Sequence, residues 1–175
     1  MDSQTLLAEL PRLRRYARAL VGERCAADDL VQDTLERAWA RFGQWRADGD
    51  LRPWLFAIMH NLRMDQLRKP RLDLVPIDDD VPELPVRANQ SDRIEVADLA
   101  AALAQLPEEQ RAVLLLVTLE EMRYADVAST LGIAVGTVMS RLHRGRKQLR
   151  ELLADVARDR GFIRGGNLDA QEVSS

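Results

Sequence analysis

A run of cations between residues 134 and 150 holds the side chains best suited to chemistry in this 175-residue chain. Positions spaced i, i+3, i+4 and i+7 share one face of a helix. Ser140, His143, Arg144 and Lys147 have this spacing, Thr137 precedes them, and Arg141, Arg146 and Arg150 flank them. Because the segment contains no acid, and because arginine binds guanine while other cations bind phosphates, the face predicts DNA binding. The alternative is a basic helix face that is merely solvated.

The rest of the sequence contains few residues of the types that form catalytic or metal centres. Cys25 is the only cysteine, and His60 and His143 are the only histidines, so a thiolate or imidazole metal cage is not expected. The sequence contains no Walker loop, no Gly-x-Gly-x-x-Gly run and no nucleophile elbow. We therefore predict a protein that is not an enzyme and that needs no cofactor or metal.

Two short amphipathic segments around Gly132 predict the elements that would position the basic face. Apolar residues in the first segment lie at Tyr124, Val127, Ala128 and Leu131, and a second helix is expected to open near Gly136 and Thr137. A helix of about eight residues, a glycine turn and a second helix form a helix-turn-helix, whose second helix lies in the DNA major groove. This context favours DNA contact over a solvated face.

Residues 1–70 predict three further helices. They cover residues 3–20 with an interruption or bend near Pro11, residues 27–42, and residues 51–68 before Pro70. In the second helix Asp28 and Asp29 are expected near the positive N-terminus. Trp39 is expected on the apolar side of that helix, which packs into the core.

The segment 71–92 breaks every helical period with three prolines and a run of three aspartates, so it predicts an extended acidic linker. We predict an all-α protein with two small helical domains. Its parts are a first domain at 1–70, the linker at 71–92, a second domain at 93–158 and a flexible tail at 159–175.

The overall charge of -3 conceals two basic blocks, at residues 51–70 and 123–150, in an otherwise acidic chain. A contact with a polyanion is therefore compatible with this charge. Apolar residues make up 46% and charged residues 30%, and no stretch approaches the roughly 18 apolar residues that span a membrane. The first residues also lack the order of a signal peptide, so a cytoplasmic location is expected.

Several motifs resemble those of bacterial extracytoplasmic-function (ECF) sigma factors, group IV of the sigma-70 family. Residues 106–111 and 124–146 are similar to the domain that reads the minus-35 promoter element. Residues 28–39, and 52–58 together with Asn61, are similar to the domain that binds polymerase and reads the minus-10 element. The resemblance covers about residues 5–155 in the order found in the family.

This resemblance implies a role for each group of residues. The minus-35 contacts would come from Thr137, Ser140, Arg141, His143, Arg144, Arg146 and Lys147. The minus-10 contacts would come from Asn61, Arg63, Arg68 and Lys69, with Asp48 and Gly49 in a loop that holds a flipped base. Polymerase contacts would come from Asp29, Gln32, Asp33 and Glu36. Trp54 and Phe56 are expected in the core rather than as stacking platforms.

The implied partners are core RNA polymerase, through its β′ clamp coiled coil and β flap, promoter DNA, and an anti-sigma factor that clamps both domains. The acidic linker would pass through the polymerase cleft toward the RNA exit path, although a simple solvated tether explains it equally well. Met139 departs from the family pattern, in which many relatives carry a cation, and His143 also replaces a different residue type. Both changes affect the expected minus-35 preference.

Two other function classes fit parts of the sequence. A freestanding regulator would use residues 123–150 to bind an operator and residues 1–70 for dimerisation or ligand sensing. A sigma-like mimic would bind an anti-sigma factor and never contact DNA, but such mimics generally carry an attached signalling domain, for which this chain is expected to have no room. Binding of an operator without polymerase would favour the freestanding regulator.

Overall fold

The computed structural model describes residues 3–45, 49–69 and 90–161. Over these residues it contains seven α-helices, one short 3-10 helix and no strand, which confirms the predicted all-α class. In chain order they are α1 (Ser3–Val21), α2 (Arg24–Ala40), η1 (Phe42–Gln44), α3 (Leu51–Arg68), α4 (Gln90–Gln105), α5 (Glu108–Thr118), α6 (Tyr124–Leu131) and α7 (Val135–Asp159). Within these ranges, no helix is both long and apolar enough to span a membrane.

Helix α1 passes through Pro11 as one element, so the predicted interruption there is wrong. Proline removes one helical hydrogen bond, which would normally reach the carbonyl of Leu7. Both residues are exposed, so water can bind that carbonyl instead. The predicted end of the helix is confirmed, because Gly22 has a φ of 82° and its N–H donates to the Arg18 carbonyl at 2.9 Å.

The start of α2 differs from the prediction because Glu23 caps it. Its carboxylate accepts hydrogen bonds from the N–H groups of Cys25 at 2.8 Å and Ala26 at 2.7 Å. These hydrogen bonds lower the pKa of Glu23, and the one from the Ala26 backbone has the largest effect. The helix therefore begins three residues early, and Asp28 and Asp29 lie beyond its first turn.

Trp39 is 62% exposed, so its predicted place in the core is wrong. The buried side of α2 is formed by Ala27, Leu30, Val31, Thr34 and Ala38. A helix turns about 100° per residue, which carries position 39 past the half-buried Leu35 and onto the solvent side.

The linker prediction extends too far, because α4 already begins at Gln90 and includes residues 90–92. Residues 70–89 and 162–175, which hold the rest of the predicted linker and most of the predicted tail, lie outside the described residues. Asp159, placed at the start of that tail, is the last residue of α7.

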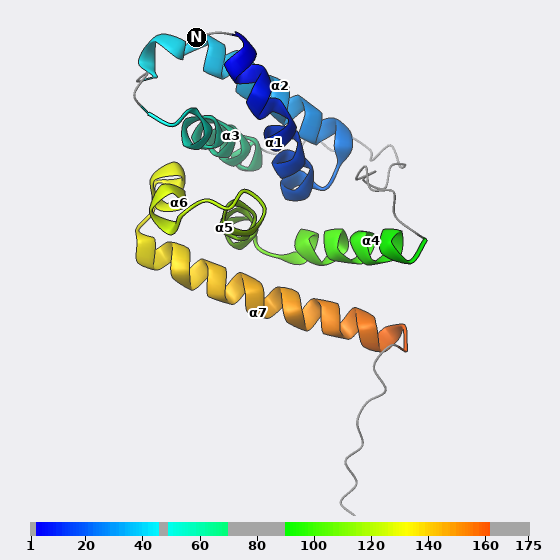
Figure 1. Ribbon diagram of the computed structural model, residues 1–175. Coiled ribbons are helices and arrows are strands. Elements are labelled where there is room, and N and C mark those ends of the chain that lie inside the picture. Colours follow the sequence, from blue (N-terminus) through cyan, green and yellow to red (C-terminus); the bar gives the residue numbers. More distant parts are fainter. Residues whose placement is uncertain (1–2, 46–48, 70–89, 162–175) are drawn as a thin grey trace, which may run out of the picture.

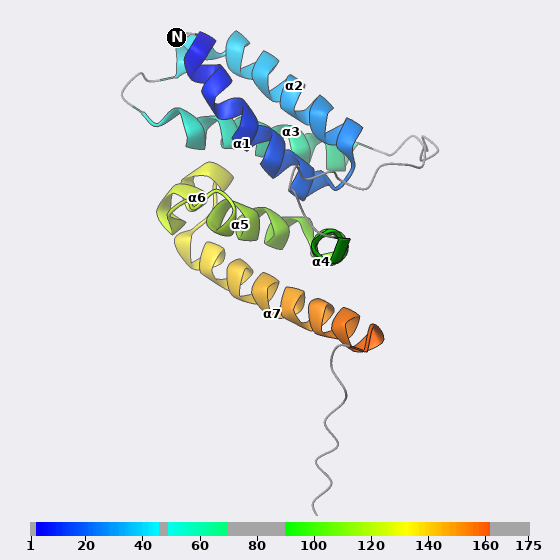
Figure 2. The same cartoon turned by 45° about the vertical axis from the view of Figure 1, so that its right-hand side comes forward.

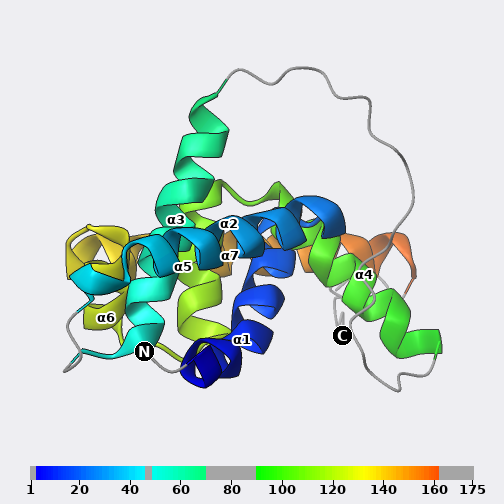
Figure 3. The same cartoon turned by 90° about the horizontal axis from the view of Figure 1, so that it is seen from above.

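The helices form two layers, with α1, α2 and α3 in one and α4 to α7 in the other (Figure 1, Figure 2). Across the layers, α1 packs on α4 and α5, and α3 packs on α6. Seen from above, α4 and α6 lie toward opposite sides of the molecule (Figure 3). The two predicted domains therefore pack face to face.

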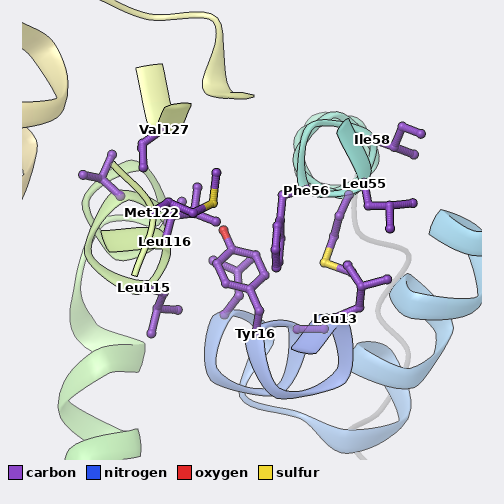
Figure 4. Close-up of a cluster of buried hydrophobic side chains, with 14 of the residues drawn as sticks. Leu13, Tyr16, Leu55, Phe56, Ile58, Leu115, Leu116, Met122 and Val127 are labelled. Atoms are coloured by element: carbon purple, nitrogen blue, oxygen red, sulfur yellow. The ribbon is translucent and has the colours of Figure 1, made fainter. Parts of the chain in front are cut away.

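One hydrophobic cluster runs through both layers. Tyr16 and Phe56 meet edge to face with ring centroids 5.0 Å apart, and Leu116 and Met122 of the second layer lie beside Tyr16 (Figure 4). The expectation that Phe56 is a core residue is confirmed, and Trp54 is half-buried against the same cluster. The pKa of Tyr16 is raised, mainly by burial and further by the charges of Glu108 and Glu120.

Candidate nucleic-acid and polymerase interfaces

The predicted helix-turn-helix is present as α6, a glycine turn and α7. Gly132 adopts the left-handed conformation with a φ of 66°, and the Ile133 N–H donates to the Ala128 carbonyl at 3.0 Å. This closed turn ends α6 and lets the chain reverse within three residues before Val135. Val138 and Leu142 then bury one side of α7.

The other side of α7 presents most of the predicted minus-35 residues together. His143, Arg144, Arg146 and Lys147 are exposed, while Thr137 and Ser140 are half-buried. The Ser140 hydroxyl donates to the Thr137 carbonyl at 3.2 Å and accepts from Arg144 Nη2 at 3.3 Å. Ser140 thus connects the Arg144 side chain to the backbone of α7.

Arg141 does not share the exposed face. Its side chain is 24% exposed and forms an ion pair with Glu109 at 3.0 Å. In this conformation the guanidinium faces α5, while the side chains of Arg144, Arg146 and Lys147 are exposed to solvent.

An open hollow of about 560 Å³ lies beside the cationic side of α7. Tyr124 and Met139 form part of its apolar wall, and His143, Arg146 and Arg150 contribute polar groups. Met139 is 54% exposed. The residue that departs from the family pattern therefore borders the predicted DNA-reading face.

The predicted minus-10 residues differ in their exposure to solvent. Asn61, Lys69 and Gly49 are exposed, and Arg68 is exposed but forms an ion pair with Asp65 at 2.7 Å. Asp48 lies outside the described residues.

Arg63, by contrast, is turned into the molecule. Its side chain is 16% exposed, and its Nε donates to Glu108 at 2.7 Å. His60, one helical turn earlier, is half-buried. Burial lowers the pKa of His60, Glu108 and Glu109 partly oppose this effect, and Arg141 adds to it.

The acidic face predicted on α2 exists as an open surface. Asp29, Gln32, Asp33 and Glu36 are all exposed, and Gln32 Nε2 donates to Glu36 Oε1 at 3.0 Å. Trp39 follows Gln32 by seven residues and Glu36 by three, so it continues this face. Sequence reasoning missed that placement, although the angular position of residue 39 could have indicated it.

Sequence reasoning also missed an apolar groove of about 320 Å³ between the layers. Leucines from four helices line it: Leu20 of α1, Leu103 of α4, Leu115 of α5 and Leu149 of α7 are examples. Arg15 and Arg18 are also among its lining residues. No group of three or more potential metal ligands occurs among the residues that the structure places.

Comparison with known proteins gives matches over both layers. Residues 6–60 match the family model described as the sigma2 domain of PhyR, and residues 97–149 match the model described as sigma-70 region 4. The ECF RNA polymerase sigma factor EcfG of Rhodopseudomonas palustris is 39% identical over 158 residues, which cover 89% of this chain and 87% of that protein.

Two solved structures share the fold. The sigma factor RpoE in complex with the anti-sigma factor NepR, from Bartonella quintana, is 35% identical with a TM-score of 0.73, covering 87% of this chain and 96% of that chain. CnrH in complex with the cytosolic domain of CnrY is 28% identical with a TM-score of 0.67, covering 87% of each chain.

Proposed function

Because this chain belongs to the ECF RNA polymerase sigma factors, we propose that it directs core polymerase to specific promoters and carries out no catalytic step itself. Residues 1–70 would bind polymerase and the minus-10 element, and residues 93–158 would bind the minus-35 element, as in a group IV sigma factor. The observation that carries this proposal is the exposed cationic side of α7, the second helix of the helix-turn-helix.

At the minus-35 element, α7 would enter the major groove of duplex DNA. Arg144 is the candidate for a bidentate contact to a guanine edge, because it is exposed and anchored to Ser140. His143, Arg146 and Lys147 would contact phosphates or neighbouring bases and release counterions. Thr137 and Arg141 join this set in the proposal, although Arg141 must first leave Glu109.

At the minus-10 element, α3 would hold a base that has left the duplex stack. Asn61 offers an exposed amide that can read a base edge, and Arg68 and Lys69 offer cations for the strand backbone. We propose that the loop containing Asp48 and Gly49 forms the pocket for the flipped base. Arg63 would contribute a further cation once separated from Glu108.

For polymerase binding, we propose that the exposed face of α2 docks on the β′ clamp coiled coil. Asp29, Asp33 and Glu36 provide charge for arginine partners, and Gln32 provides an amide. Trp39 adds a large apolar surface at one edge of the same face, a residue type that often dominates interface energy. The second domain would contact the β flap.

Regulation by an anti-sigma factor is the remaining part of the proposal. Its support is that the related RpoE was solved with the anti-sigma factor NepR. The apolar groove between α1, α4 and α5 is where we expect a helix of such a regulator to contact both layers.

Transcription in vitro with purified core polymerase on a genomic fragment library tests the whole proposal. Addition of the protein should produce new start sites that share two upstream elements. Operator protection without polymerase would support a freestanding regulator instead. Binding to an anti-sigma factor with no change in initiation would support a sigma-like mimic.

A further inference from the structure

Three large apolar side chains are exposed where α6 and α7 begin. They belong to Tyr124, the first residue of α6, and to Val135 and Met139 in the first two turns of α7. Val135 and Met139 lie four positions apart, so they share one face of the helix. Tyr124 and Met139 line the same hollow of about 560 Å³. We call these three residues the apolar patch, and a partner that covers it gains free energy by removing it from water.

Polar and cationic side chains border the apolar patch. His143, Arg146 and Arg150 line the same hollow as Met139, and the exposed Arg144 follows on the adjoining side of α7. An apolar protein surface that covered the patch would also have to desolvate these charges. Duplex DNA instead offers phosphates to the arginines and base edges to the residues between them. The charge around the patch therefore favours duplex DNA as its partner.

The residues next to Met139 leave space in front of it and offer little hydrogen bonding. Gly136, one turn earlier on the same face, has no side chain, and a Cβ there would meet no neighbouring side chain within 4 Å in the described structure. The Ser140 hydroxyl donates its only hydrogen to the Thr137 carbonyl and accepts from Arg144. Met139 therefore faces open space, while Ser140 has no hydrogen left to donate to a base.

The major groove presents one apolar group to such a surface, the C5 methyl of thymine. We propose that Met139, with Val135 and Tyr124 beside it, binds the methyl group of one thymine and thereby selects an A·T pair in the minus-35 element. This inference rests on the proposed function, in which α7 enters the major groove and its first turns contact base edges. Arg144 lies five positions, or about 7.5 Å, farther along the helix, so it reads a different base pair.

Contact with a single methyl group gives a small preference that can still be measured. Removal of one such group from water corresponds to about a fourfold change in affinity. Replacement of thymine by deoxyuridine deletes only the methyl group and keeps every hydrogen-bonding atom of the base. The comparison therefore separates the methyl contact from the contribution of Arg144 and from phosphate contacts.

The test measures equilibrium binding of the holoenzyme, this chain with core polymerase, to duplexes that carry only a minus-35 element. The element is selected from a random pool as the sequence enriched over binding by core polymerase alone, which does not depend on transcription. Each thymine of the element, on either strand, is then replaced singly by deoxyuridine. The same duplexes are measured with Met139→Ala and with the control Leu7→Ala. Both side chains are exposed, and Leu7 lies on α1 in the other layer.

We expect deoxyuridine at one thymine to raise Kd about fourfold for the unsubstituted protein and for Leu7→Ala. In Met139→Ala the same replacement should change Kd by less than about 1.5-fold, because the side chain that covers the methyl group is absent. An enriched element without an A·T pair, no enriched element, or a change below about twofold at every thymine in the unsubstituted protein would overturn the proposal. An undiminished effect in Met139→Ala would also overturn it.

A second variant, Met139→Lys, shows whether this position faces the DNA bases, the DNA backbone or a protein. The lysine should abolish the deoxyuridine effect and steepen the dependence of log affinity on log salt by about 0.9. The steeper salt dependence without a deoxyuridine effect in the unsubstituted protein would place Met139 at a phosphate and overturn methyl recognition. No response to either change would overturn it in favour of a protein partner. A methyl effect without new start sites in transcription would support the role of Met139 and count against the proposed function.

Discussion

Replacement of Trp39 by alanine should weaken binding to core polymerase without changing the fold. Trp39 is 62% exposed, so its truncation removes little packing and should change the free energy of unfolding by less than about 0.5 kcal/mol. At an interface, an aromatic anchor of this kind contributes about 2–4 kcal/mol. At about 1.4 kcal/mol per tenfold, Kd should rise roughly 30-fold to several hundred-fold.

The matched control is Leu7→Ala, because Leu7 is 61% exposed on α1, away from the proposed docking face. Both variants are titrated against labelled core polymerase at low and high salt. The effect of Trp39→Ala should persist at high salt because the contact is apolar, whereas that of Asp29→Asn should shrink as the charge is screened. Equal affinities of Trp39→Ala and Leu7→Ala would refute the assignment of Trp39 to the interface.

Three further predictions concern single side chains. Arg144→Ala should cost about 1–3 kcal/mol of discrimination at one minus-35 position, measured by binding to a panel of duplexes; a uniform loss across sequences would make it a phosphate contact. Tyr16→Phe should raise the free energy of unfolding, measured by urea denaturation, by about 1 kcal/mol, because the buried hydroxyl has no hydrogen-bond partner among the residues described. A decrease of about 1 kcal/mol in the free energy of unfolding would contradict this. Burial lowers the pKa of His60, so the unfolded chain binds its proton more readily and stability should fall as pH drops through about 6.5. His60→Gln should reduce that slope between pH 7.5 and 5.5, and an unchanged slope would exclude His60 as a contributor.

The helix-turn-helix could be predicted from sequence because its signals are local. Gly132 separates two short amphipathic segments, and only a residue that tolerates a positive φ fits a turn of this kind. The exposed cations of α7 follow from the same periodicity, since Val138 and Leu142 determine which side is buried. Arg141 is the exception, because its direction depends on Glu109 in another helix.

The errors in α2 arise where a local pattern is ambiguous. Glu23 was not predicted as a cap, because the apolar stripe begins only at Ala27 and the acids at 28 and 29 offered a plausible helix start. Trp39 lies at the border of the stripe, where its size and hydrophobicity favoured burial. Periodicity does not identify the Glu23 cap, whereas the angular position of residue 39 places Trp39 at a border from which its side chain can face solvent.

The packing of the two layers could not be predicted from sequence. Arg63 and Glu108 are separated by 45 positions, and Arg15 and Glu120 by 105. Each of these residues alone is indistinguishable from an ordinary solvated surface charge. Only the tertiary structure shows that the acids are covered and that their partners come from the facing layer.

The net charge of -3 is a poor guide to DNA binding in this protein, because distance decides which acids matter. At physiological salt, charges more than about 8–10 Å apart in solvent are largely screened, so the acids on the open face of α2 have little effect on the cations of α7. Glu108 and Glu109 act at 2.7 Å and 3.0 Å from single arginines, one in each domain. Competition between promoter phosphates and these two carboxylates should therefore affect DNA affinity more than the remaining surface acids do.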